Sequence, residues 1–401
     1  MAVVGPGLAA RDQREDVTIL VETTAHAMAA ALAALAPSDA RLAVCGATDW
    51  TGVGAAPAGL IALDETAPSA ILARAVAAVW RTATAEDEAA ARAATFAALG
   101  LRRPSPPEPP RRGPRILYVG APDPFYLAFE RAAQNADGDV RAALTSFAAF
   151  DHLHDEPFDA VALNGGADPA STLSLCGALR RNADLHTLPT LFIAQADDGA
   201  GADAAERGAA VTCDVRADAG AALAWLAQAV AVERRRRTAE TDLAAMRAAA
   251  AEPRTGLFNP AFIEAHIETL AQRAHAAGRP LSVACLRISP APGASAPHPA
   301  AWARGFSEAA ALAGRVVRTA DSAAVWDDNT LAFAFPGLDL AEAESAIGRI
   351  VAIGECTAFA ADGGAGPLDF HRATMMLAPG ESGAGVLARA LGGLNAWAAR
   401  A

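Results

Sequence analysis

The side chains with the clearest capacity for chemistry are an arginine and an aspartate three residues apart, Arg318 and Asp321, in the run Arg-Thr-Ala-Asp. At this spacing around a helix end, both side chains can contact one ligand. A guanidinium fork binds a phosphate or the Hoogsteen edge of a guanine through paired hydrogen bonds, and a carboxylate accepts hydrogen bonds from ring N–H groups. The same spacing also occurs in simple surface ion pairs, worth less than about 1 kcal/mol.

Composition limits which other chemistries remain. The chain has 401 residues, and all 33 of its basic residues are arginine, because the sequence contains no lysine. This excludes Walker-type phosphate lysines, Schiff-base lysines and lysine-switched receivers. The formal net charge of -12 argues against broad binding to nucleic acid or to anionic membranes. We therefore expect no nucleic-acid partner, and any anionic ligand must be bound locally by arginine.

Other motifs give weaker signals. The five cysteines are scattered without a CxxC pair, as buried reduced thiols of a cytoplasmic protein would be. His152 and His154 have no matching ligand cluster, so we expect no metal and no other cofactor. The N-terminal residues lack a signal-peptide pattern, and no charge-free apolar stretch reaches the roughly 18 residues of a membrane span. We expect a cytoplasmic protein without direct membrane insertion.

The elements that must position these residues fall into five segments. A proline-rich linker over 102–114 separates residues 1–101 from the rest of the chain. Short apolar runs alternate with helical patterns over 115–220, which predicts a parallel sheet with right-handed crossovers. The pattern of residues 1–101 is a shorter version of this α/β arrangement, with strands expected over 17–22, 41–46 and 59–65. Residues 221–251 contain no Gly or Pro and predict one long connecting helix, and residues 252–401 form the last segment.

Residues 115–220 resemble a response-regulator receiver, since the run LCGALRRNADLHTLPTLFIA follows that family's helix, loop and fourth strand in order and spacing. Asn164 stands where the family has its acceptor aspartate, and an amide is not a competent nucleophile for a phosphoryl group. The resemblance implies a flavodoxin-like fold without phosphorylation. In the first segment, which we also interpret as receiver-like, Asp64 is a candidate phospho-acceptor, although an aspartate there also suits a helix N-cap.

Residues 252–401 resemble a GGDEF (diguanylate cyclase) domain over nearly their whole length. The runs EPRTGLFNP, GRPLSVACLRI and RVVRTADSAAVWDDNTLAFAF match the family's opening motif, first strand and signature hairpin in order. The signature itself becomes DDNTL at residues 327–331, and Arg287 replaces the metal-binding aspartate of the first strand. The resemblance implies an α+β domain that has lost its catalytic residues, its metal and its cyclase activity.

In the same register, Arg318 and Asp321 fall on the family's inhibitory RxxD site, which binds cyclic di-GMP away from the catalytic centre. Arg349 falls where the family supplies a further arginine from a neighbouring subunit or domain. The order receiver, receiver, helix, GGDEF is similar to the PleD group. The resemblance implies a homodimeric cyclic di-GMP receptor that acts as an adaptor for protein partners, recruited to the cell pole for regulated proteolysis of a cell-cycle regulator. A nucleotide-free scaffold and a residual cyclase are the alternatives.

Overall fold

The computed structural model of the chain is a mixed α/β structure whose residues fall into two compact units. The first unit contains Met1–Ala83 and Glu108–Thr238, and the second contains Thr84–Pro107 and Ala239–Ala401. The structure describes residues 2–4, 18–20, 68–106, 108, 112–166, 168–195, 199–291, 297–357, 359 and 368–398.

Two long helices, α2 (Ser69–Ala98) and α7 (Ala219–Ala249), contribute residues to both units. Helix α7 confirms the single helix predicted over 221–251. Its first half packs in the core of the first unit through Leu223, Leu226 and Val230, and its second half packs in the core of the second unit. The helix is therefore part of both cores rather than a bare connection.

A five-stranded parallel sheet forms the centre of the first unit, in the order β4-β3-β5-β6-β7. This order is that of a flavodoxin-like, doubly wound fold, and it confirms the alternation of strands and helices predicted over 115–220. The strands are β3 (Arg115–Val119), β4 (Asp139–Ala143), β5 (Ala160–Asn164), β6 (Thr190–Ala194) and β7 (Val211–Asp214).

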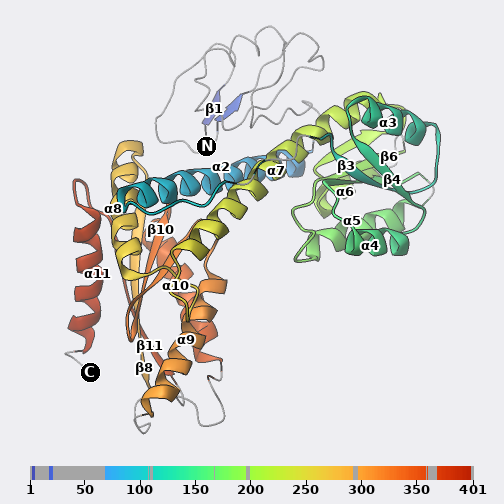
Figure 1. Cartoon of the computed structure of the whole chain (residues 1–401). Coiled ribbons are helices and arrows are strands. Elements are labelled where there is room, and N and C mark those ends of the chain that lie inside the picture. Colours follow the sequence, from blue (N-terminus) through green and yellow to red (C-terminus); the bar gives the residue numbers. More distant parts are fainter. Residues whose placement is uncertain are drawn as a thin grey trace. The chain divides into compact units, whose positions relative to one another are not determined.

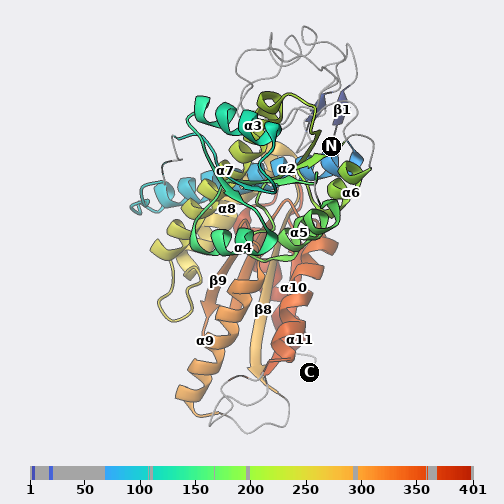
Figure 2. The same ribbon diagram turned by 90° about the vertical axis from the view of Figure 1, so that its right-hand side faces the viewer.

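Helices cover both faces of this sheet (Figures 1 and 2). Helices α3 (Pro124–Asn135) and α7 share a buried apolar cluster with one face. Helices α4 (Ser146–Asp155), α5 (Pro169–Arg181) and α6 (Ala200–Arg207) share a second cluster with the other. Strands β3, β5 and β6 are buried on both faces, so they read in the sequence as short continuous apolar runs.

Less of the N-terminal segment is described. Strand β1 (Ala2–Val4) pairs in parallel with β2 (Thr18–Leu20), and β2 lies within the strand predicted over 17–22. Asp64 and the other two strands predicted for this segment lie outside the described residues. The sequence assigned residues up to 101 to this segment, but residues 84–98 of α2 belong to the second unit, where Ala91 and Phe96 are buried in its core.

The second unit is built on a four-stranded antiparallel sheet in the order β11-β8-β10-β9. The strands are β8 (Leu281–Pro290), β9 (Ser322–Asp327), β10 (Thr330–Pro336) and β11 (Leu368–Met376). The first strand and the hairpin that the resemblance of this segment led us to expect correspond to β8 and to the hairpin of β9 and β10. The central strand β8 pairs with β10 on one side and β11 on the other.

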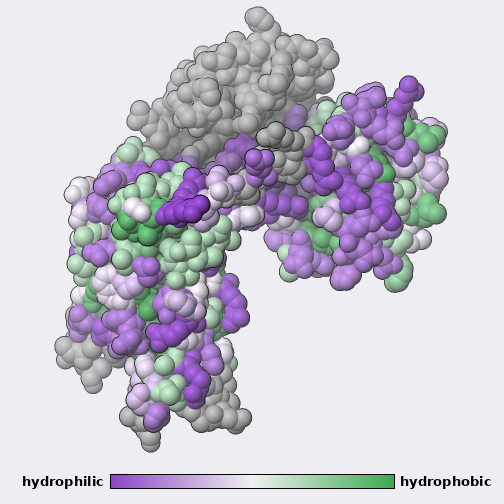
Figure 3. Space-filling model, viewed as in Figure 1, coloured by the Kyte–Doolittle hydropathy of each residue, from purple (hydrophilic) through white to green (hydrophobic). Residues whose placement is uncertain are grey.

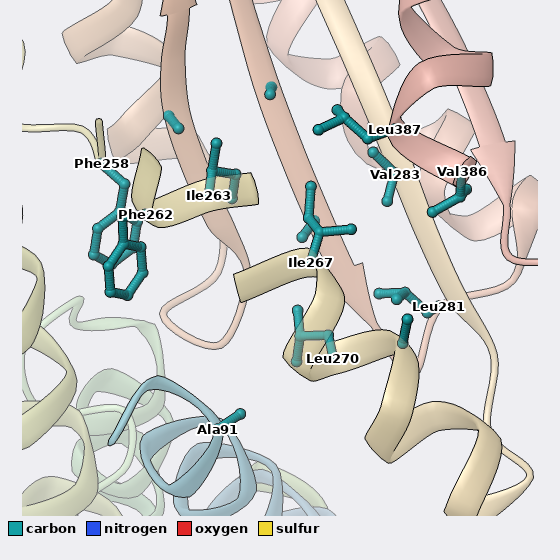
Figure 4. Close-up of a cluster of buried hydrophobic side chains, with 14 of the residues drawn as sticks. Ala91, Phe258, Phe262, Ile263, Ile267, Leu270, Leu281, Val283, Val386 and Leu387 are labelled. Atoms are coloured by element: carbon teal, nitrogen blue, oxygen red, sulfur yellow. The ribbon is translucent and has the colours of Figure 1, made fainter. Parts of the chain in front are cut away.

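Alternating residues of these strands feed two cores on opposite faces of the sheet. Phe333 and Phe335 of β10 face α9 (Pro299–Val316) and α10 (Leu340–Glu355). Ala332 and Ala334 face the opposite cluster, which contains α8 (Pro260–Ala277), α11 (Gly383–Ala398), the end of α2 and the second half of α7. Figure 4 shows part of this cluster, in which side chains of α8, β8 and α11 point toward one another.

Figure 3 shows hydrophilic and hydrophobic residues interspersed over the visible faces of both units. In the described ranges, no helix is long and apolar enough to cross a membrane.

Candidate functional site

Arg318 and Asp321 lie in the turn that joins α9 to β9, which confirms the predicted position at a helix end. Asp321 Oδ2 accepts a hydrogen bond from the backbone N–H of Arg318 at 3.1 Å, and the Asp321 N–H donates to the Arg318 carbonyl at 3.0 Å. No ion pair joins the two side chains. The carboxylate is therefore fixed by the backbone of the turn, and the guanidinium is left to contact other groups.

The two side chains differ in exposure. Arg318 is exposed, and within the described part of the chain its guanidinium has no hydrogen bond or ion pair. Asp321 is only 7% exposed, and this burial raises its pKa to about 6. Glu88 also raises that pKa, whereas the turn's own N–H and the charges of Arg318 and Arg92 lower it. The site thus combines a free cation with a carboxyl group that titrates close to neutrality.

The turn is held by Arg92 of α2, which sequence reasoning did not single out. Its Nη2 donates to the carbonyl oxygens of Thr319 at 3.0 Å and Asp321 at 3.1 Å. Its Nε pairs with Glu88 Oε1 at 2.7 Å, and both side chains are 1% exposed. The only signal in the sequence is the i, i+4 spacing of Glu88 and Arg92, which more often marks a solvent-exposed pair on a helix surface.

Arg349, the third predicted residue, lies on α10 and is exposed. Among the residues that the structure describes, no hydrogen bond or ion pair links it to Arg318 or Asp321. The structure therefore brings two of the three predicted residues together. The third lies on a neighbouring helix that covers the same face of the sheet as α9.

The residues in the position of the cyclase signature do not fit a magnesium ion. Asp327 Oδ1 accepts the Asn329 N–H at 2.9 Å, and the Thr330 hydroxyl donates to Asn329 Oδ1 at 2.9 Å. On β8, Arg287 lies opposite Thr330 and donates to Asn395 Oδ1 at 2.9 Å. Magnesium prefers carboxylate and water oxygens in octahedral geometry, and here one carboxylate oxygen already accepts a backbone N–H. Arg287 instead adds a positive charge.

At the end of β5 in the first unit, polar side chains also bond to one another and to the backbone. Asn164, at the end of β5, donates from Nδ2 to Asp123 Oδ2 at 2.8 Å and accepts the Gly166 N–H at 2.9 Å. The other oxygen of Asp123 accepts the Tyr126 N–H at 2.8 Å and caps α3. Both side chains therefore act as structural hydrogen-bonding groups.

The cysteines and histidines add no site. Cys176, Cys213 and Cys285 are buried, as expected. Cys356 is exposed, contrary to expectation, because it follows the last residue of α10 and lies beyond that helix's buried stripe. His152 and His154 lie in the last turn of α4.

Comparisons with known proteins found similar solved structures. No protein-family model matches the chain, and no curated protein matches it. The chain is similar to the GGDEF domain of DgcB from Caulobacter crescentus in complex with c-di-GMP, with 19% identity and a TM-score of 0.33 over 37% of this chain and 86% of that one. It is similar to the FimX GGDEF domain from Pseudomonas aeruginosa, with 19% identity and a TM-score of 0.35 over 38% and 95%. It is also similar to a candidate response regulator from Chloroflexus aurantiacus, with 21% identity and a TM-score of 0.28 over 30% and 99%.

Proposed function

We propose that this chain is a catalytically inactive, GGDEF-like receptor for cyclic di-GMP. The observation that carries the proposal is the turn from Arg318 to Asp321, where an exposed guanidinium, with no hydrogen bond or ion pair to the described residues, stands beside a carboxylate fixed by the backbone. The guanidinium suits a phosphate or the Hoogsteen edge of guanine, and the carboxylate suits the guanine N1 and N2 hydrogens. Cyclic di-GMP presents all of these groups on one molecule.

The geometry of the turn favours binding because little has to be ordered when the ligand arrives. The Asp321 carboxylate is already held by the Arg318 N–H at 3.1 Å, so it loses little conformational freedom on binding. Arg349 supplies the second positive charge of the proposed site, acting on a ligand bound to a neighbouring copy or domain. Its exposed position on α10 suits that role.

The loss of cyclase activity rests on the substituted signature. Asp327 and Asn329 bond to their own hairpin, and Arg287 lies where the resemblance places a metal-binding aspartate. A residual cyclase would need two metal ions beside that arginine, against its charge. We propose that GTP is not turned over, and incubation with GTP and Mg²⁺ tests this. Product formation that falls in an Asp327→Ala variant would instead support a residual enzyme.

The cellular role is proposed from resemblance. The predicted order of segments is similar to the PleD group, and the combination of lost signature and retained RxxD run looks most like PopA within it. We propose a cytoplasmic homodimeric adaptor that is recruited to the cell pole and, when loaded with cyclic di-GMP, delivers a cell-cycle regulator to a ClpXP-type protease. The receiver-like modules would serve in dimerisation and docking, without phosphorylation unless Asp64 accepts a phosphoryl group.

A nucleotide-free scaffold is the second candidate function. Leu127, Leu144 and Phe147 of the first unit are 62%, 69% and 78% exposed, and exposed apolar side chains of this size suit protein contacts. The scaffold requires no affinity for cyclic di-GMP and no effect of changing Arg318.

Calorimetric titration of the full chain with cyclic di-GMP distinguishes the two. Loss of a paired, charge-assisted contact is worth about 3 kcal/mol, so Arg318→Ala is expected to weaken binding about 100-fold. Arg315, exposed in the last turn of α9, provides the matched control. Arg315→Ala makes the same change of charge and is expected to leave the affinity within about twofold. Absence of binding by the wild type would overturn the proposed function.

A further inference from the structure

Arg92 is a buried cation whose hydrogen bonds end mainly on backbone. Besides the carbonyls of Thr319 and Asp321, it donates from Nη1 to the Leu243 carbonyl of α7 at 3.3 Å. Its guanidinium also lies over the ring of Phe258, 5.1 Å from the centroid. One side chain on α2 therefore contacts α7, the segment just before α8 and the turn that carries Arg318.

Its charge is balanced by a buried network. Glu88 Oε1 accepts hydrogen bonds from Arg92 Nε at 2.7 Å and from the Ser322 hydroxyl at 3.2 Å, and it lies 3.0 Å from His266 Nε2. The other ring nitrogen of His266 lies 2.9 Å from the Thr95 hydroxyl. All five residues are at most 3% exposed. Burying such a charged network costs free energy unless every member is satisfied. Stability alone therefore does not explain why the network is present.

Apolar residues of α2 already supply the packing of this helix. Ala89, Ala91 and Phe96 are buried in the same core. What Arg92 adds is a donor group that bonds to two carbonyls of the turn, those of Thr319 and Asp321. The network therefore fixes a backbone shape, and the shape it fixes is that of the proposed binding turn.

We propose that Arg92 is a positioning residue of the ligand site, so that the Arg318–Asp321 turn keeps its binding shape only while residues 84–98 of α2 are packed on the second unit. This inference rests on the proposed function of the turn. Because coupling between two equilibria is reciprocal, bound ligand would in turn stabilise the packing of α2. Helix α2 thereby becomes the element through which the site is regulated.

The expected consequences of removing Arg92 follow from its contacts. The two turn carbonyls lose their donors, and the backbone that orients the Asp321 carboxylate is freed. The charged groups facing that carboxylate are Arg318 on its own turn and Glu88 and Arg92 on α2, and Arg92 is one of those that lower its pKa. Without Arg92, the pKa of Asp321 should therefore rise further, and binding should need a higher pH.

The binding test compares Arg92→Met with a matched variant in the full chain. Arg279 pairs with Asp87 of α2 at 3.0 Å, and this ion pair does not involve the turn. Arg279→Met therefore removes a second arginine contact to the same helix. We expect Arg92→Met to weaken cyclic di-GMP binding at least about tenfold and Arg279→Met to change it less than about twofold. Equal losses in both variants would mean general loosening of α2 and would overturn the inference.

A second variant covers the case in which unpaired Glu88 prevents folding. The double change Glu88→Gln with Arg92→Gln removes both buried charges together and keeps side chains of similar size. It is also expected to weaken binding at least about tenfold, because the two N–H donors of a side-chain amide cannot replace the guanidinium's hydrogen bonds to Leu243, Thr319 and Asp321 as well as the bond to residue 88. Wild-type affinity in this variant would overturn the inference.

A readout without ligand separates this inference from the proposed function. Hydrogen exchange at the amides of Arg318 and Asp321 reports whether the turn keeps its shape. We expect faster exchange at both amides in both Arg92 variants but not in Arg279→Met. NMR titration should show a higher pKa of Asp321 in the single variant Arg92→Met, where Glu88 keeps its charge. Unchanged exchange would overturn the role of Arg92 even if the wild type binds cyclic di-GMP. Failure of the wild type to bind, with faster exchange in the variants, would overturn the proposed function alone.

Discussion

Replacing Asp321 by asparagine is expected to stabilise the second unit at neutral pH while weakening ligand binding. Burial raises the pKa of this carboxyl group from 3.8 to about 6. Between these values the unfolded chain releases a proton that the folded chain keeps, so stability falls as the pH rises through this window. At about 1.4 kcal/mol per tenfold change in proton affinity, the ionised carboxylate opposes folding by up to about 3 kcal/mol above pH 6.

Asparagine keeps the shape and the hydrogen bond without the charge. Its side-chain oxygen can accept the Arg318 N–H that now bonds to Asp321 at 3.1 Å. We therefore expect Asp321→Asn to gain up to about 3 kcal/mol at neutral pH and nothing below about pH 4, where both forms of the chain keep the carboxyl protonated. A carboxylate retained at this cost points to a role in binding rather than in folding.

The assay follows urea unfolding by hydrogen exchange in peptides from β8 and β10, which report the second unit alone. Wild type and Asp321→Asn are compared at neutral pH and at about pH 4. A stability difference that does not change with pH, or a variant less stable than wild type at neutral pH, would refute the reasoning.

Two further predictions concern the charge of Asp321 and the charge at position 164. Binding of cyclic di-GMP should weaken about tenfold between neutral pH and about pH 5, because Asp321 takes up its proton in this range. Calorimetry at several pH values measures this. An affinity that does not change with pH would argue against the carboxylate as hydrogen-bond acceptor. In the first unit, Asn164→Asp places a second carboxylate about 2.8 Å from Asp123 Oδ2 and should destabilise by about 1–3 kcal/mol in the presence of a chelator. Thermal unfolding measures this, and an equal or higher Tm would contradict it.

The sheets could be predicted largely from apolar runs. Strands β3, β5 and β6 were expected because they are short apolar runs. The hairpin of β9 and β10 was expected from the resemblance of its sequence to the GGDEF signature hairpin. Strand β4 gave no such signal, since it is an edge strand whose residues Asp139–Ala143 are mostly exposed. Its place depends on pairing with β3, a tertiary contact that local composition does not encode.

The sequence indicated the residues of the candidate site but not how their side chains are buried and held. The spacing of Arg318 and Asp321 indicated a pair of exposed side chains, whereas Asp321 is buried and bonds to the backbone of Arg318. Arg92 and Glu88 were not singled out from the sequence, because nothing in an alanine-rich helix shows which face is covered. The proline-rich linker suggested a boundary after residue 101, but the structure assigns α2 to both units. These features arise from long-range packing.

The most direct test of the proposed receptor is a calorimetric titration of cyclic di-GMP into the full wild-type chain at neutral pH, repeated with Arg318→Ala. We expect saturable binding by the wild type and a loss of about 100-fold in the variant. A wild type that does not bind cyclic di-GMP, or a variant that binds it equally well, would contradict the assignment of the ligand site to the turn of Arg318 and Asp321.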